Sequence, residues 1–363
     1  MPIPVTTDDE IKLIRYQRSD RERVFALVRE VFPSSYSERL IRQWDWKYDA
    51  NPFNRGGEPD IELLTKGEEL VAMYGRLFYP VAVEGKEHLA HHACDLVVHP
   101  AYRGRNLSAR LRGPRRQCRS DLHFSWQNEA SYRVSSREGR GGVPFVSLFK
   151  PLDVARIAQH LLGDRTLGRT AGRVIAAARR LVPRIRRRGT VPGVSLERVR
   201  SFDERFDRLW QRACRDYPVM VVRDRRYLEW RFGRRPDARY DVIAVSRASE
   251  LAGYMVTRSG SESGDWGYLV DFLVEERSSR LFSFLLDEAV ESLRREGAVG
   301  ISCRVAVPPY RGLLYRHGFV PLLGAPRGYL RATVRLANAE PRGLTDPGCW
   351  FLTMGDGDLE MSL

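Results

Sequence analysis

The sequence lacks the features that would place the protein in a membrane or in an oxidising compartment. It has no run of about 18 apolar residues, so no transmembrane helix is expected. Its first residues are polar and acidic, unlike a secretory signal. The five cysteines lie far apart, in neither a metal-ligand pattern nor a disulfide framework. We therefore expect a cytoplasmic protein with reduced thiols and no metal.

Lysine is also scarce, although the chain is strongly basic. Only five of the 60 basic residues are lysine, and the formal net charge is +14. An arginine bias of this kind is typical of a GC-rich genome. The other interpretation is an affinity for polyanions, such as phosphorylated cofactors, nucleic acid or an anionic membrane surface.

The chain contains an internal repeat. Residues 46–52 read WKYDANP and residues 230–236 read WRFGRRP, so both have Trp, a basic residue, an aromatic ring and a final Pro. Further along, DLVV at 95–98 matches DFLV at 271–274. Because the matches occur in the same order, they predict an internal duplication.

Each half is predicted to have helical segments first, then a hairpin of strands, a central strand, a helix and another strand. Early hairpins followed by βαβ-like connections indicate an α/β (α+β) fold with a mixed sheet in each half. We predict an N-terminal domain at 1–153, a linker at 154–196 and a C-terminal domain at 197–363. The two domains are called the first and second halves below.

The linker has a composition of its own. Residues 154–188 contain ten arginines and one acid, Asp164, with apolar residues at helical spacing. This pattern predicts a basic amphipathic helix. It either packs on one domain with a solvated arginine face, or anchors the protein, peripherally, on the inner face of an acidic membrane or on nucleic acid.

A phosphate-binding turn is predicted in the stretch DLVVHPAYRGRNLSARL at 95–111. A strand, a basic turn and a helix start converge there, and N–H groups at a helix start bind anions. Arg103 and Arg105 can add charge-assisted contacts. Asn106 and Ser108 stand where such turns usually have glycine, but Asn tolerates left-handed backbone well and Ser adds a hydroxyl donor. We call residues 99–108 the cradle; the alternative is a degenerate turn that binds no cofactor.

The corresponding turn of the second half has the opposite charge. It reads VEERSS, with Glu275 and Glu276 where anion donors would be needed, and it has no glycine. Like charges repel a pyrophosphate. The second half is therefore expected to have lost cofactor binding, which leaves one site in each chain.

The stretch around the cradle resembles the acyl-CoA-binding signature of the GNAT N-acyltransferase superfamily. That signature is a strand ending in Val-x-Pro, then Tyr-Arg-Gly-x-Gly-x-Gly or Ala, and a helix. The segment LYRHGF at 314–319 resembles a later Tyr-x-x-Gly-Phe element of the family. The positions of the signature that match are Val98, Pro100, Tyr102, Arg103, Gly104, Arg105 and Leu111.

The resemblance implies two tandem GNAT-like mixed-sheet domains joined by a basic helical linker. It also implies an acyl-CoA co-substrate, acetyl-CoA or another thioester, and transfer of the acyl group to an amine. The acceptor would be a small molecule bound between the halves. The implied cofactor-binding residues are Leu96, Val97, Val98, Arg103, Gly104, Arg105, Asn106, Leu107, Ser108 and Asn128.

In the family, a base is often supplied by the central strand before the cradle. His92 lies near that position, and imidazole titrates in a useful range; the alternative is a hydrogen-bonded core histidine. Asp95 is the next candidate, but Asp271 matches it in the half without a cradle, which favours a structural role. Strict strand alternation would put His92 and Cys94 on one face and Asp95 on the other.

The family's acid is commonly a tyrosine that follows an asparagine at the end of the next strand. Here Asn128 could bond the pantetheine amides and Tyr132 could protonate the thiolate. Their separation is shorter than usual, so Tyr132 is alternatively a packed aromatic, and Glu129 is a further ionisable group at that edge.

Two other functions remain open from the sequence. Tandem GNAT-like halves and a basic surface also suit an aminoacyl transferase that uses aminoacyl-tRNA. The arginines of 154–188 would suit a catalytically inactive GNAT fold that binds nucleic acid or a membrane surface.

Overall fold

The structure is a computed structural model and describes seven stretches of the chain. They are residues 10–112, 120–127, 143–157, 191–260, 266–321, 328–334 and 349–357. Most of the predicted linker, residues 158–190, lies outside them, so the predicted linker helix and the domain boundaries remain predictions.

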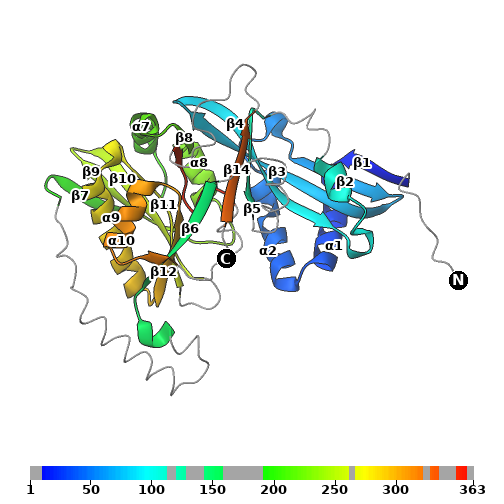
Figure 1. Cartoon of the computed structure of the whole chain (residues 1–363). Helices are drawn as coiled ribbons and strands as arrows, with labels where there is room; N and C mark the ends of the chain where they lie inside the picture. The colour runs from blue at the N-terminus through cyan, green and yellow to red at the C-terminus, as the bar shows by residue number, and fades with distance from the viewer. Residues whose placement is uncertain are drawn as a thin grey trace.

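The first half begins with a strand that was not predicted, and then follows the predicted order of helices, hairpin, central strand and helix (Figure 1). Amphipathic helices form next because apolar residues recur every three or four positions in 22–44. The elements are β1 (Ile11–Arg15), α1 (Arg21–Val31), α2 (Ser34–Trp44), the π-helical turn η3 (Asp45–Asp49), β2 (Asp60–Lys66), β3 (Glu69–Val83), β4 (Lys86–Val98), η5 (Pro100–Tyr102), α3 (Leu107–Arg112), β5 (Leu122–Gln127) and β6 (Val143–Pro151).

The second half repeats this order. Its elements are β7 (Val194–Val199), α7 (Glu204–Ala213), β8 (Val219–Val221), α8 (Arg225–Leu228), the π-helical turn η8 (Glu229–Gly233), β9 (Asp241–Arg247), β10 (Glu250–Ser259), β11 (Trp266–Val274), η9 (Glu275–Arg277), α9 (Ser279–Arg295), β12 (Gly300–Val305), α10 (Pro308–Arg316), β13 (Val320–Pro321), β14 (Gly328–Val334) and β15 (Trp350–Phe351). The two repeated Trp motifs form matching π-helical turns, η3 and η8.

The two halves exchange strands where their sheets meet. The main strand order is β1-β2-β3-β4-β5-β14-β6-β12-β11-β10-β9-β7. β6, from the first half, pairs antiparallel with β12 of the second, and β14, from the second half, pairs antiparallel with β5 of the first. Both lie at the centre of Figure 1. Each half therefore completes its sheet with a strand of the other.

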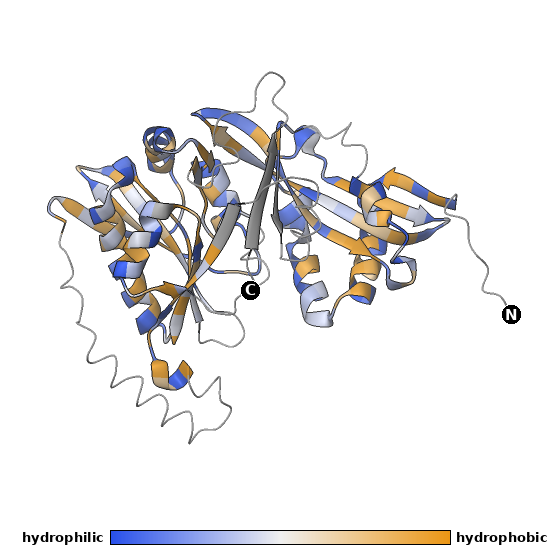
Figure 2. Ribbon diagram, in the orientation of Figure 1, coloured by the Kyte–Doolittle hydropathy of each residue, from blue (hydrophilic) through white to orange (hydrophobic). Residues whose placement is uncertain are grey.

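Residues on opposite faces of the first-half sheet pack against different helices. On β2 and β3, Leu63 and Met73 join the main core with Val24 of α1. Their neighbours Leu64 and Tyr74 join a smaller cluster that includes α3. This is the period-two alternation of a sheet covered on both faces. Figure 2 shows hydrophobic residues along the strands of both halves and mixed colouring on the helices.

Candidate functional site

The cradle joins the end of β4 to the start of α3. Two of its residues take left-handed backbone conformations: Gly104 at φ 81° and Asn106 at φ 56°. Only glycine, and to a lesser degree Asn and Asp, adopts this region without much strain. Asn106 therefore supplies the conformation that glycine provides in the usual signature. No atom lies within 4 Å of the place where a side chain on Gly104 would begin.

The helix that follows the cradle, α3, is anchored to strands β3 and β1. Leu107 and Leu111 are buried against Val71 and Tyr74 of β3. A guanidinium N–H of Arg110 donates to the Ile11 carbonyl at 2.6 Å. The first N–H groups of an α-helix have no partner within the helix. The N–H groups at the start of α3 are thus positioned at the cradle.

The arginines of the cradle are held by neighbouring groups. The Nε of Arg103 donates to the Val98 carbonyl at 3.3 Å. The Arg105 guanidinium lies 5.2 Å from the centre of the Tyr102 ring, a cation–π distance. Tyr102 donates to Glu69 at 2.8 Å, and this hydrogen bond raises the pKa of Tyr102. Its phenol therefore stays protonated and fixes the ring under Arg105.

Between His92 and the cradle, β4 is no longer paired with β5. They pair in parallel from Ala90 with Leu122 to His92 with Phe124. After that point β5 pairs only with β14. We call the space between the diverging ends of β4 and β5 the first slot; it opens at the cradle and closes at His92. Of the predicted positions on β4, Leu96 is 42% exposed, Val97 is buried and Val98 is half-buried.

A β-bulge interrupts β4 beside the first slot. Its register with β3 shifts between Met73 and Gly75, and Asp95 has a φ of 49°. The expected alternation of faces is therefore wrong here: the Tyr48 hydroxyl lies 3.3 Å from Cys94 Sγ and donates to Asp95 at 2.6 Å. The bulge turns both side chains toward the same side.

Asp95 is held in a buried ion pair. Lys47 Nζ donates to Asp95 Oδ2 at 2.6 Å, and both side chains are 5% exposed. Burial, together with Asp95 and Cys94, raises the pKa of Tyr48 well above its ordinary value, so Tyr48 remains a donor. The Tyr48 hydroxyl lies only 2.1 Å from where a side chain on Gly75 would begin, so this packing requires glycine. Lys47 was not among the predicted site residues, although it is one of only five lysines and lies inside the repeated WKYDANP motif.

His92 lies at the closed end of the first slot. Its side chain is 1% exposed, and its ring centre is 6.5 Å from that of Tyr79. Its neighbour His91 is hydrogen-bonded to Ser120. The structure thus places His92 and Asp95 on β4, the strand that leads into the cradle, whereas Asn128, Glu129 and Tyr132 lie outside the described residues.

The corresponding turn of the second half is closed by its own side chains. Ser278 caps α9 by accepting from the Leu281 N–H at 3.3 Å. Glu275 accepts from Arg247 at 3.2 Å and lies 3.5 Å from Arg212. The turn therefore presents the Glu275 carboxylate, already paired with arginines, where the cradle presents arginines.

The described part of the chain contains neither a metal-ligand cluster nor a membrane-spanning helix. In these stretches no group of three His, Cys, Asp or Glu side chains could hold a metal ion. Nor does any helix in the described part of the chain have the length and apolarity to cross a membrane.

Residues 12–113 match the family model for the acetyltransferase (GNAT) domain. The first half contains a GNAT domain. The match includes the central strand, the cradle and α3, so the predicted resemblance to the GNAT superfamily is confirmed. No curated protein matches the sequence.

Several solved structures, one of them a tandem GNAT protein, share the fold of most of the chain. A tandem GNAT protein from the clavulanic acid biosynthesis pathway is 15% identical, with a TM-score of 0.53 over 91% of this chain and 100% of its own. N-myristoyltransferase of Saccharomyces cerevisiae with bound myristoyl-CoA is 13% identical, with a TM-score of 0.59 over 94% and 86%. A probable N-acyltransferase of Enterococcus faecalis is 13% identical, with a TM-score of 0.57 over 93% and 74%. The chain therefore has a tandem GNAT fold, as predicted.

Proposed function

We propose that the protein is an N-acyltransferase that moves an acyl group from acyl-CoA to the amine of a small molecule. The observation that carries this proposal is the cradle, where Asn106 supplies the left-handed backbone and two arginines, Arg103 and Arg105, precede the helix start. The matching turn of the second half offers carboxylates instead. Of these two turns, only the cradle therefore suits a pyrophosphate.

The direction of the first slot supports a position for the thioester. With the pyrophosphate at the cradle, the pantetheine arm would run between β4 and β5 toward the closed end at His92. Six residues of strand, about 20 Å, separate Val98 from His92. The acyl group would then lie near the bulge, beside Cys94 and Asp95.

The contacts of Asp95 make it the weaker of the two candidate bases. The Asp95 carboxylate already accepts hydrogen bonds from Lys47 and Tyr48, so taking a proton would disrupt a buried ion pair. A neutral imidazole at His92 would accept the proton of the acceptor ammonium. The amine nitrogen then attacks the thioester carbonyl and the C–S bond breaks. The departing thiolate takes a proton, for which Tyr132 stays the proposed donor, and the attacking nitrogen loses its second proton to solvent, from which Tyr132 is reprotonated.

Three further features remain part of the proposal. Acetyl-CoA is the first thioester to consider, and longer acyl-CoAs follow because the similar yeast structure holds myristoyl-CoA. The proposed setting is cytoplasmic, or peripheral to a membrane. The arginines of 154–188 are proposed to contact an anionic partner, either a membrane surface or nucleic acid.

Titration calorimetry with acetyl-CoA and longer acyl-CoAs tests the proposal. We expect one thioester to bind, and Arg103→Ala and Arg105→Ala each to weaken it by about tenfold through the loss of a charge-assisted contact. Arg316→Ala, an exposed arginine on α10, is the matched control and should bind normally. Failure of every thioester to bind would overturn the proposed function.

The other functions predict different results. An aminoacyl transferase would copurify with RNA, and the binding would fall steeply with salt. A catalytically inactive binding module would lose its partner when residues 154–188 are deleted, and would not respond to Arg103→Ala.

A further inference from the structure

The second half has a counterpart of the first slot. β11 and β12 pair in parallel from Trp266 with Gly300 to Leu269 with Cys303, and their pairing then stops. The register of β11 with β10 shifts at Val270, so β11 has a bulge where β4 has one. We call the space between the diverging ends of β11 and β12 the second slot.

Residues 349–357, near the C-terminus of the chain, occupy the second slot. On one side, Thr353 forms an antiparallel bridge with Val305 at the end of β12. On the other, the Gly355 N–H donates to the carbonyl of Val270 at 2.8 Å. The segment is thus hydrogen-bonded to both strands that border the slot, and one of these bonds is made at the bulge of β11.

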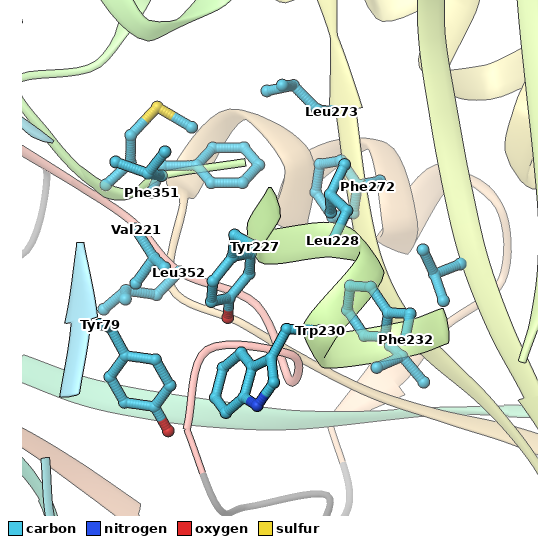
Figure 3. Close-up of a cluster of buried hydrophobic side chains, with 14 of the residues drawn as sticks. Tyr79, Val221, Tyr227, Leu228, Trp230, Phe232, Phe272, Leu273, Phe351 and Leu352 are labelled. Atoms are coloured by element: carbon cyan, nitrogen blue, oxygen red, sulfur yellow. The ribbon is translucent and has the colours of Figure 1, made fainter. Parts of the chain in front are cut away.

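An aromatic side chain of residues 349–357 packs against rings of the second half. Phe351 is fully buried, and its ring centre lies 5.4 Å from that of Phe272 on β11 and 4.6 Å from that of Tyr217. Figure 3 shows Phe351 and Leu352 in the same cluster as Phe272 and Val221. The segment therefore belongs to the hydrophobic core of the second half.

A buried polar network holds the segment in place. Thr353 Oγ1 donates to Asp271 at 2.7 Å, and its N–H donates to Asp356 at 2.8 Å. Arg223 donates to both carboxylates, at 2.9 Å to Asp271 and 2.7 Å to Asp356. None of these side chains is more than 1% exposed. Removing the segment would take Asp356 away from Arg223 and Thr353 away from Asp271. The loss of polar partners is costly for buried charges.

The first slot has no such occupant in the parts of the chain that the structure describes. In these parts, β3 pairs with the other edge of β4 and β14 with the other edge of β5. No further described segment is joined to β4 or β5 by a backbone hydrogen bond in the region where their pairing has stopped. An extended peptide and a pantetheine arm offer the same groups to a strand edge, amide N–H and C=O. Residues 349–357 therefore fill the second slot, whereas no described part of the chain fills the first.

We infer that residues 349–357 are a permanent, built-in occupant of the second slot, in the place that an acyl-CoA arm takes in the first. The identity of the arm in the first slot rests on the proposed function. The occupancy of the second slot rests on its own contacts. The chain consequently binds one acyl-CoA, and thioester does not displace the segment.

Hydrogen–deuterium exchange of the full-length protein tests this inference. Amides of 349–357 should exchange at least about 100-fold more slowly than in an unfolded peptide, because they belong to the core. Saturating coenzyme A should leave their rates unchanged while it slows exchange in 103–112. Fast exchange in 349–357, or faster exchange when coenzyme A is added, would overturn the inference.

A variant pair shows whether the fit of the segment causes the protection. A methyl group at Gly355 would lie 3.1 Å from Phe232 and 3.2 Å from Asp271, so Gly355→Ala should speed exchange in 349–357 by about tenfold. The control Gly312→Ala, which has open space around it, should not. β9 amides report on global unfolding; equal acceleration there, or none in 349–357, would contradict the inference.

Titration calorimetry with coenzyme A distinguishes the proposed function from the built-in occupant of the second slot. One coenzyme A per chain supports both. Two per chain overturn the built-in occupant but leave the proposed function standing. No binding, without slowed exchange in 103–112, overturns the proposed function, and the exchange of 349–357 then decides the second slot on its own.

Discussion

Trp46 and Trp230 form a reciprocal pair across the two halves. Their ring centres are 5.1 Å apart with planes inclined by 17°. The indole N–H of Trp46 donates to the Trp230 carbonyl at 2.7 Å, and that of Trp230 donates to the Trp46 carbonyl at 3.0 Å. The same motif thus meets its own copy about a local twofold axis, and each copy satisfies a backbone group of the other.

Shortening one member of this pair should destabilise the whole chain. Trp230→Ala removes a buried ring and should lower the free energy of unfolding by about 3–5 kcal/mol. Trp230→Phe keeps an aromatic ring but leaves the Trp46 carbonyl without its donor, for a loss of about 1–3 kcal/mol. Urea denaturation measures both, and equal losses would mean that ring packing contributes little.

The Lys47–Asp95 pair should show strong coupling in a double-mutant cycle. Lys47→Met or Asp95→Asn alone breaks the buried ion pair, at a cost of about 3–5 kcal/mol. The double variant should cost less than the sum of the two. The exposed pair Arg208–Glu250, with side chains 45% and 52% exposed, is the control, and its coupling should stay below about 1 kcal/mol. Similar coupling in both pairs would contradict the buried role of Lys47.

The backbone of Asn106 leads to a prediction about cofactor binding. Asn106→Gly can adopt the same φ and should retain acetyl-CoA affinity, whereas Asn106→Val is strained there and should weaken binding by about tenfold. Gly297→Val places the same residue at a φ of 89° far from the cradle, so it should lower stability but not affinity. Calorimetry and thermal unfolding separate the two effects. Normal affinity in Asn106→Val would remove the cradle from cofactor binding.

Asp356 should make stability depend on pH. Burial raises the pKa of Asp356 from 3.8 to about 6; Arg223 opposes the rise and Asp271 adds to it. At a pH between these two pKa values, the folded state binds more protons than the unfolded state. The contribution of Asp356 to stability therefore falls as pH rises from about 4 to 6, and is constant above that.

Asp356→Asn cannot titrate, so it isolates this effect. The free energy of unfolding of the wild type, minus that of Asp356→Asn, should fall from pH 4 to pH 6 and then level off. Urea denaturation at intervals of one pH unit measures it. A difference that does not change with pH would show that the pKa of Asp356 is not raised.

Local patterns made most elements of the fold predictable. The hairpin of β2 and β3, the central strand, the cradle and the repeated order of elements all follow from apolar periodicity and the duplicated motifs. The left-handed conformation of Asn106 follows from its residue type and its position in the turn. These features depend on neighbours in the sequence.

Other features depend on contacts between distant parts of the chain. The bulge at Asp95 arises from the register between β3 and β4, and it overturned the expected alternation of faces. Lys47 and Asp95 are 48 positions apart, and Thr353 and Asp271 are 82 apart. No local pattern links such pairs, so neither the buried ion pair nor the filling of the second slot could be predicted from the sequence.

The exchange of β6 and β14 has a consequence for synthesis on the ribosome. β5 is translated long before β14, the strand that pairs with its outer edge. Until then, the first half has an open strand edge, the kind of edge at which chains aggregate. The nascent protein therefore cannot finish one domain before it starts the next. Its yield should depend on how quickly the last part of the chain is made, and on chaperones that cover the waiting edge.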